Sequence, residues 1–440
     1  MKVSRFVLVC VGVVGVFAGV VRAEGRRARR PKRALPVVRA ITALRNASSR
    51  ITVRDRERTA DWTWVEVDYY DETYPLTIDI LVKNPPRISK TAYLITSSSL
   101  NFKSSFFTPA EGSLAREMAS AGYLVVGITP REDNVPFEAD QSVMASWGMK
   151  KHRKDIRKVV RIMQVLTRRP YDIIGHSLGA ICVLDYAATY SGRLDTVVAL
   201  DVPSFDPEVE TNMAAYAGMA LNAYDTLMAD EVYSEHAVAD YKELLQVSGL
   251  YPDADSGVPR DALGEPGNFT LNGLLHFSMI YTAYLPGVIT ELTGLPQEWP
   301  MVFSNAAGIY NSAPNPTNDV FQLIQTDVDK MRQVGPEIGS GATPLALLRD
   351  YTAAIVGEET YTINWSGIDE KVVWINAGLG MGAQTHGADL IREAGNANVT
   401  VHVVPNYGHV DVVFGTNAAE DVWDFFVQEP PPRVRPMRVR

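Results

Sequence analysis

The sequence predicts an α/β fold: a mostly parallel sheet with helices on both faces and a helical cap insertion. Three observations predict it. Short apolar runs alternate with amphipathic stretches over residues 59–206 and again over 362–428. A tight-turn motif at residues 175–179 joins one apolar run to a helical one. In between, residues 207–361 lack the strand pattern and are rich in Ala, Leu, Met and Tyr at helical spacing, which predicts the cap.

Residues 1–23 are predicted to be a signal peptide or a membrane anchor. Lys2 and Arg5 precede an apolar run over residues 6–21, and Ala23 is a small residue where a signal peptidase would cleave. We therefore expect the protein to be exported, secreted or periplasmic, or membrane-anchored if the segment is retained.

Residues 24–58 are basic and lack a sustained period, which is typical of a disordered segment. Six basic side chains gather over residues 26–33 and suit association with an anionic membrane surface. Ten of the 42 Lys and Arg residues lie in residues 1–40, whereas 50 of the 51 acids lie beyond them. The acidic body argues against nucleic acid as a partner. The Pro/Arg-rich residues 429–440 are predicted to be a loose tail.

The core begins with two alternating runs, 62–69 and 76–82, which predict an antiparallel hairpin. The later runs are apolar and largely unbroken, as strands buried on both faces should be. These predicted strands are residues 92–95, 123–128, 171–174, 196–200, 372–376 and 399–404. Helices are predicted at residues 110–121, from 149 to before Pro170, at 181–188 and at 418–427.

The pentapeptide at residues 175–179 reads Gly-His-Ser-Leu-Gly and stands between a predicted strand and a predicted helix. We call it the elbow. A strand that turns tightly into a helix exposes the side chain of the middle residue beyond the sheet, and glycines on either side let strand and helix approach. Ser177 is therefore the candidate nucleophile, and it needs a base to remove its proton.

The order of the elements, the elbow and the late sequence Tyr-Gly-His-Val-Asp at residues 407–411 resemble the α/β-hydrolase superfamily. Within it, the likeness is to capped esterases and lipases of the acid-lipase type. The resemblance implies a serine hydrolase that cleaves carboxylic esters, with His409 as general base for Ser177. It also implies that the backbone N–H of Leu178 donates to the oxyanion, and it aligns Ser98 with the second donor.

The acid of the triad is left open by the sequence. In the family it usually follows the strand before the histidine, but the corresponding turn here, residues 377–385, has no carboxylate. Asp201, at the end of the strand after the elbow helix, is favoured because some members place their acid there. Asp389 is the alternative, and Asp206 and Asp411 are further choices.

Other kinds of site are not indicated by the motifs. The chain has no H-E-x-x-H, C-x-x-C or Walker sequence, so neither a metal nor a cofactor is expected. Gly378, Gly380 and Gly382 lack an acidic ribose partner and are interpreted as a flexible loop near the active site. The size and apolar content of the cap suggest an ester with a hydrophobic acyl chain or a lipid-like substrate.

Two other functions remain open. An acyltransferase or an amidase on the same fold would use the same serine, because nothing in the motifs selects water as the acceptor. A non-catalytic binding protein is favoured by the missing acid and by the loop at residues 96–99, which lacks the His-Gly pair common in the family.

Overall fold

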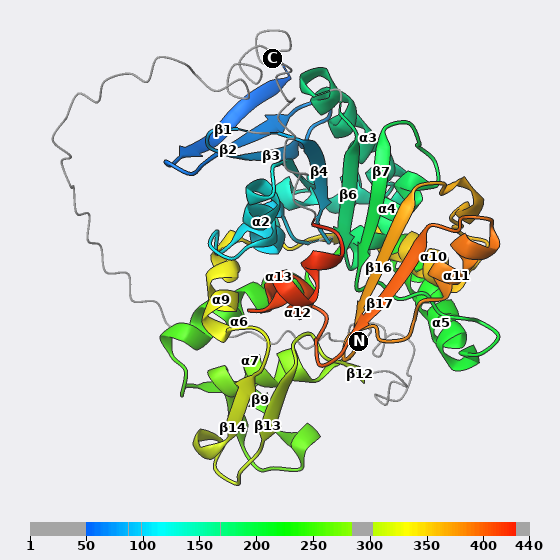
Figure 1. Cartoon of the computed structure of the whole chain (residues 1–440). Helices are drawn as coiled ribbons and strands as arrows, with labels where there is room; N and C mark the ends of the chain where they lie inside the picture. The colour runs from blue at the N-terminus through cyan, green and yellow to red at the C-terminus, as the bar shows by residue number, and fades with distance from the viewer. Residues whose placement is uncertain (1–49, 87, 98, 168, 284–301, 428–440) are drawn as a thin grey trace, which may run out of the picture.

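The computed structural model describes residues 50–86, 88–97, 99–167, 169–283 and 302–427 (Figure 1). The predicted targeting segment, most of the basic segment and the C-terminal tail lie outside these ranges, so export and membrane-surface binding stay predictions. Within the described residues, no helix is both long and apolar enough to cross a membrane.

A nine-stranded sheet, counted over the described residues, forms the centre of the protein in the order β1-β2-β3-β5-β4-β6-β7-β16-β17. The pairs β1/β2, β2/β3 and β3/β5 are antiparallel, and from β5 to β17 all pairs are parallel. The strands are β1 (Ile51–Arg58), β2 (Trp62–Tyr69), β3 (Leu76–Lys83), β4 (Lys90–Ile95), β5 (Tyr123–Thr129), β6 (Tyr171–His176), β7 (Leu194–Leu200), β16 (Lys371–Ala377) and β17 (Val399–Val404). The predicted mostly parallel sheet is confirmed.

Strand β1 corrects the predicted extent of the disordered segment, whose last eight residues are an edge strand instead. The strand pairs with β2, and only Ile51 in it is buried. An edge strand needs one neighbour and little burial, so the charged residues that follow Ile51 leave no apolar pattern to detect.

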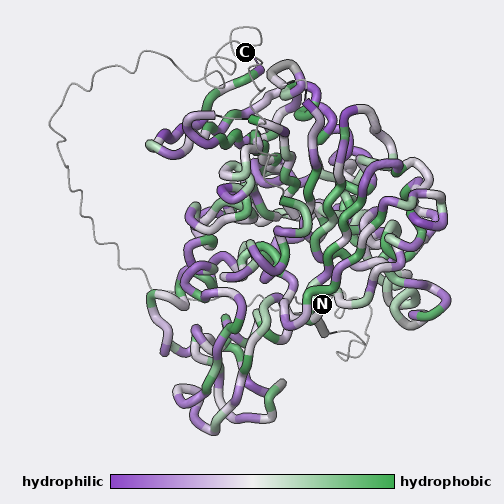
Figure 2. The backbone as a smooth tube through the Cα atoms, in the orientation of Figure 1, coloured by the Kyte–Doolittle hydropathy of each residue, from purple (hydrophilic) through white to green (hydrophobic). Residues whose placement is uncertain are grey.

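Helices cover both faces of the sheet. One hydrophobic core holds residues of α3 (Met149–Leu166), α4 (Leu178–Ala187), α10 (Leu345–Val356) and α11 (His386–Glu393). The core on the other face holds residues of α2 (Leu114–Ser120), α12 (Asp411–Phe414) and α13 (Ala418–Asp421). Figure 2 shows the hydrophobic residues concentrated in the central strands between these layers. This double covering explains why the parallel strands read as unbroken apolar runs.

The insert at residues 207–361 contains more than the predicted helices. Besides α10, the described part of the insert has the α-helices α5 (Thr211–Ala229), α6 (Ala237–Leu250), α7 (Leu271–Ile280) and α9 (Val328–Val334). Over its described residues the insert also has four two-stranded ribbons: β8 (Ser234–Glu235) with β15 (Thr343–Pro344), β9 (Asp255–Pro259) with β10 (Asn268–Thr270), β11 (Thr282–Ala283) with β12 (Val302–Phe303), and β13 (Gly308–Asn311) with β14 (Val320–Leu323). The predicted helical cap therefore also contains short strands that the sequence did not indicate, because strands of two to five residues are too short to show alternation.

The insert packs on both faces of the sheet. Helices α5 and α10 share the core of α3 and α4, whereas α6, α7 and α9 share the opposite core with α2. Figure 1 shows α6, α7, α9 and the ribbon β13/β14 as a lobe below the sheet, with α5 and α10 to one side. We call residues 237–344 the cap lobe.

Candidate active site

The elbow holds Ser177 in a backbone conformation that non-glycine residues rarely adopt. Ser177 joins β6 to α4 with φ 55° and ψ −127°. Its N–H donates to the carbonyl of Leu200 at 2.9 Å, and its own carbonyl accepts from the N–H of Ala180 at 2.8 Å. These two bonds anchor the strained residue between the end of the sheet and the first turn of α4.

Both glycines of the elbow are required by close approach of the backbone. A Cβ on Gly175 would lie 2.2 Å from the carbonyl oxygen of Gly179. A Cβ on Gly179 would lie 2.5 Å from the carbonyl oxygens of Ile95 and Thr96. The second contact packs the start of α4 against the end of β4, where the predicted oxyanion loop begins.

Asp201 lies beside His409. The Oδ2 atom of Asp201 is 2.6 Å from Nδ1 of His409, and Asp201 is completely buried. A carboxylate accepts this hydrogen bond, so Nδ1 carries the hydrogen and Nε2 is the atom that can take a proton from a serine. The structure therefore brings together the favoured acid and the histidine predicted from the sequence.

A turn after β16 surrounds the carboxylate of Asp201. The N–H groups of Ala377 and Met381 donate to Oδ1 of Asp201 at 2.6 and 3.1 Å. A Cβ on Gly380 would lie 2.4 Å from Oδ2 of Asp201, so only glycine fits there. The flexible-loop interpretation of these glycines is wrong, because the turn is packed and hydrogen-bonded around the acid.

The pairing of the strands explains how Asp201 reaches His409 from the end of β7. Strands β7 and β16 are neighbours, with Leu200 in register with Ile375. Asp201 follows β7 directly and its N–H donates to the carbonyl of Ile375 at 2.7 Å. A carboxylate at the end of β7 therefore reaches the turn after β16, the position that the resemblance assigns to the acid of the triad.

Two of the other candidate acids, Asp389 and Asp206, have partners of their own. Asp389 is on the exposed surface of α11, where its carboxylate pairs with Arg392 at 2.8 Å. Asp206 accepts from the backbone N–H of Glu208 at 2.9 Å. The alternative assignment of Asp389 is thus not supported, because a surface carboxylate paired within its own helix does not reach His409.

His176 links the elbow to the histidine loop, residues 407–411. Its Nε2 donates to the carbonyl oxygen of His409 at 2.8 Å, and the two ring centroids are 4.6 Å apart. Burial, together with the neighbouring His409, lowers the pKa of His176 to about 3. His176 is therefore neutral at ordinary pH, and its contacts place His409 next to the residue that precedes Ser177.

Comparison with known proteins supports the fold. No family model matches the chain, and no curated protein matches its sequence. A solved structure of a candidate lipase from Sulfolobus solfataricus aligns over 86% of this chain and 97% of its own, with a TM-score of 0.57 and 16% identity. The chain has the α/β-hydrolase fold. At this identity, the similarity establishes the architecture alone.

Two other solved structures align with TM-scores below 0.5. A thermostable carboxyl esterase from Bacillus coagulans aligns over 80% of this chain and 92% of its own, with 13% identity and a TM-score of 0.43. A bromoperoxidase from Bacillus anthracis aligns over 78% and 91%, with 13% identity and a TM-score of 0.41.

The predicted oxyanion donors are the backbone N–H groups of Leu178 and Ser98. Leu178 is the first residue of α4, so its N–H has no partner in the helix and lies at the positive end of the helix dipole. Ser98, the predicted second donor, lies outside the described residues. Its neighbour Ser99 has φ 69°, and the Ser99 hydroxyl bonds that of Thr343 in the cap lobe. The cap lobe therefore holds the loop that the resemblance assigns to the oxyanion.

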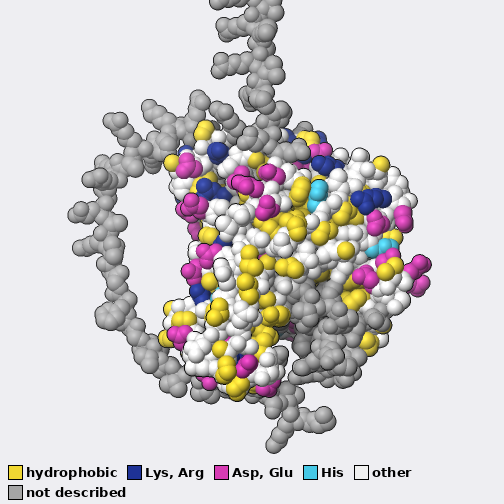
Figure 3. Space-filling model, turned by 60° about the horizontal axis from the view of Figure 1, so that its bottom comes forward, with side chains coloured by type: hydrophobic (Ala, Val, Ile, Leu, Met, Phe, Trp, Pro, Cys, Tyr) yellow, Lys and Arg dark blue, Asp and Glu magenta, His cyan; other side chains and the backbone are white. Residues whose placement is uncertain are grey.

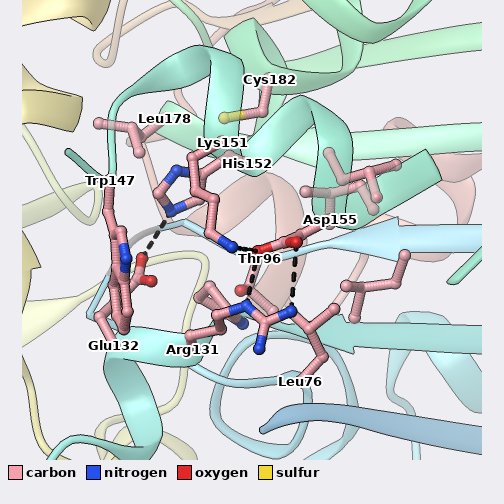
Figure 4. A pocket seen from close by; sticks show the side chains of 14 residues that line it. Leu76, Thr96, Arg131, Glu132, Trp147, Lys151, His152, Asp155, Leu178 and Cys182 are labelled. Atoms are coloured by element: carbon pink, nitrogen blue, oxygen red, sulfur yellow. Dashed lines mark hydrogen bonds and ion pairs between the residues drawn. The ribbon is translucent and has the colours of Figure 1, made fainter. Parts of the chain in front are cut away.

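A small cavity lies beside the elbow (Figure 4). Leu178 and Thr96 line it together with charged residues of α3 and of the loop after β5, and its volume is about 30 Å³, room for about one water molecule. The guanidinium of Arg131 pairs with Asp155 at 2.8 Å in its wall. A cavity of this size does not accommodate an acyl chain.

His152 and Glu132 form a second pair in that wall, at 2.9 Å. The other ring nitrogen of His152 is 3.0 Å from the carbonyl oxygen of Gly148, so both nitrogens face oxygen acceptors. Burial lowers the pKa of His152, but the charge and hydrogen bond of Glu132 outweigh it and raise that pKa. The sequence alone does not indicate these residues, because their pairing depends on α3 packing against the loop after β5.

Across the residues that the structure describes, no cluster of three or more His, Cys, Asp or Glu side chains could hold a metal ion.

Proposed function

We propose that this protein is a serine hydrolase that cleaves carboxylic esters. The observation that carries the proposal is the 2.6 Å hydrogen bond between Asp201 and His409, next to an elbow that holds Ser177 at φ 55°. A buried carboxylate, an oriented imidazole and a serine on a strained turn are the parts that acyl transfer through a serine requires. The similarity in fold to a candidate lipase agrees with this function.

In the first step, Oγ of Ser177 attacks the ester carbonyl carbon while Nε2 of His409 takes the hydroxyl proton. The Asp201 carboxylate stabilises the imidazolium that forms and keeps the ring in its tautomer. The tetrahedral intermediate collapses as His409 gives the proton to the leaving alkoxide. The products of this step are the free alcohol and an acyl group on Ser177.

In the second step, His409 takes a proton from a water molecule, which attacks the acyl carbon. His409 then returns the proton to Oγ of Ser177, and the carboxylic acid leaves. In both steps the negative oxygen is held by the N–H of Leu178 at the start of α4, and Ser98 is the proposed second donor. Each such donor contributes roughly 3 kcal/mol to stabilising the transition state.

The proposed substrate has a hydrophobic acyl chain. Tyr281, Ile309, Val320 and Ile324, all in the cap lobe, are each about half or more exposed, at 47, 50, 66 and 56%. Figure 3 shows hydrophobic side chains spread over the centre of the face turned toward the viewer, with charged ones mostly at its margin. Apolar surface of this kind suits contact with a lipid-like ester.

Labelling by a fluorophosphonate probe tests the proposal, because the probe reacts quickly only with an activated serine. The wild-type protein should be labelled and should hydrolyse p-nitrophenyl esters of short and medium acyl chains. Ser177→Ala should abolish labelling and reduce kcat by about 10⁴-fold or more. Ser191→Ala, which changes an exposed serine in the α4–β7 loop, is the matched control and should behave as wild type.

Unchanged hydrolysis by the Ser177→Ala protein would disprove the proposal. Analysis of the products distinguishes hydrolysis from acyl transfer, since a hydrolase releases the free acid even when an alcohol or amine acceptor is present.

A further inference from the structure

We propose that Asp411 is a positioning residue that ties the histidine loop to the cap lobe and thereby orients His409. This inference rests on the proposed function, since it assigns a role within the same site. Asp411 does not take the place of the triad acid, because Asp201 holds the imidazole.

The carboxylate of Asp411 joins three segments of the chain. Asp411 is completely buried. Its Oδ2 accepts from the backbone N–H of Gly408, in the histidine loop, and from that of Ala307, in the cap lobe, each at 2.7 Å. Its Oδ1 accepts from the hydroxyl of Thr326, also in the cap lobe. One side chain thus fixes the residue before His409 against the cap lobe.

The cap lobe also holds the backbone on either side of the imidazole. The N–H of His409 donates to the carbonyl of Ser304 at 2.8 Å, and that of Val410 donates to the carbonyl of Asn305 at 2.7 Å. A Cβ on Gly408 would lie 2.7 Å from Cα of Ala306, so the two segments are in direct backbone contact. His409 therefore cannot move independently of residues 304–307.

The environment of Asp411 suits a structural acceptor. Burial raises the pKa of Asp411, and its N–H and hydroxyl donors oppose that rise, while the charge of Asp201 adds to it. A buried carboxylate is costly unless donors surround it, and the three donors reduce this cost. If the carboxylate were removed, two buried N–H groups would lose their acceptor, and the histidine loop would relax to find another.

Removal of the Asp411 carboxylate should misorient the imidazole of His409 without removing any group that reacts with the substrate. A displacement of about 1 Å in a reacting group can cost about 10²-fold in rate. Removing Asp411 should therefore lower kcat, whereas KM, which reflects the binding of substrate by the cap lobe, should change little. It should also disturb the hydrogen bond between Asp201 and His409, although neither of those residues is changed.

The test compares Asp411→Ala with two milder variants and a control in the full-length protein. Asp411→Ala should lower kcat about 10–100-fold with less than a threefold change in KM. Asp411→Asn keeps an oxygen for both N–H groups and should recover most of the loss. Thr326→Val removes one bond and should lower kcat only a few-fold. Tyr407→Phe, which breaks a 2.7 Å bond between the same loop and Asp421 without involving the cap lobe, should leave kcat within twofold of wild type.

A second readout does not depend on any substrate. The proton shared by Asp201 and His409 should give a low-field resonance in the NMR spectrum of the wild-type and Tyr407→Phe proteins, and Asp411→Ala should broaden or remove it. Wild-type kcat and an unchanged resonance in a folded Asp411→Ala protein would overturn the inference. If that variant does not fold, wild-type kcat in both Asp411→Asn and Thr326→Val would overturn it. A wild-type protein that shows the resonance but neither hydrolysis nor labelling would instead contradict the proposed function.

Discussion

The two halves of the candidate site are built differently. The serine half is mostly local: the turn at residues 175–179 sets the backbone conformation of Ser177, and its contacts with the rest of the chain are backbone contacts with the ends of β4 and β7. The acid and histidine half is assembled from distant parts, since Asp201 bonds residues that lie 176 and 208 positions further along the chain. The first half depends on the backbone of a few residues. The second depends on strand order and on the cap lobe, so changes far from the serine should affect it most.

Within the acid and histidine half, the largest effect is expected at Asp201, the acid that contacts His409. Asp201→Asn places an amide beside Nδ1 of His409, which favours the wrong tautomer and removes the charge that stabilises the imidazolium. We expect kcat to fall about 10³–10⁴-fold. Steady-state hydrolysis of a p-nitrophenyl ester measures this loss.

Asp389→Asn provides the matched control on the surface of α11, where it breaks only the exposed pair with Arg392. Exposed pairs of this kind contribute about 0–1 kcal/mol, so kcat should stay within twofold of wild type. The opposite ranking of the two variants would reverse the assignment of the acid.

The same difference explains what could be predicted from the sequence. Ser177 could be predicted because strand, turn and helix are consecutive, and the strands β4 to β7 because burial on both faces leaves unbroken apolar runs. Asp201 could only be favoured among several acids. Asp201 lies beside His409 because β7 pairs with β16. The order of strands in the sheet cannot be read from a single sequence, so this contact could not be predicted.

The parts that were missed have little local pattern. Strand β1 lies at an edge, and the ribbons of the insert have two to five residues per strand, so neither shows a clear period. The spacing of Gly378, Gly380 and Gly382 is visible in the sequence, but it predicts a flexible loop and not a turn packed around a carboxylate. A glycine that packs against a carboxylate and one in a mobile loop look alike until their neighbours are known.

A smaller loss of kcat is expected when the turn after β16, which surrounds the carboxylate of Asp201, is changed. In Gly380→Ala the new Cβ would meet Oδ2 of Asp201 at 2.4 Å, so the carboxylate or the turn must shift. We expect kcat to fall about 10–100-fold, and the free energy of unfolding to fall by about 1–3 kcal/mol. Kinetics and urea unfolding measure the two changes. Gly218→Ala, in α5 with nothing within 4 Å of the new Cβ, should keep full activity. Equal behaviour of the two variants would mean that the turn does not support the acid.

The smallest effect on activity is expected at His176, where the local half of the site contacts the distant half. Its pKa is lowered to about 3 in the folded protein, against 6.5 for the unperturbed group. As pH falls below 6.5, the unfolded chain gains a proton that the folded protein does not, so this residue makes the protein less stable in acid. Between pH 7 and pH 5 the loss amounts to about 2 kcal/mol.

His176→Gln keeps an N–H donor for the carbonyl of His409 but does not titrate, so kcat at pH 7 should stay within about tenfold of wild type. Urea unfolding of both proteins at pH 7 and pH 5 should show a smaller loss of stability in the variant, because every other titrating group is common to the two and cancels in the comparison. An equal loss in both proteins would mean that His176 gains its proton in the folded state as readily as in the unfolded one. In that case the elbow would not hold the histidine loop through a neutral imidazole, and Asp201 and the cap lobe would keep His409 in place.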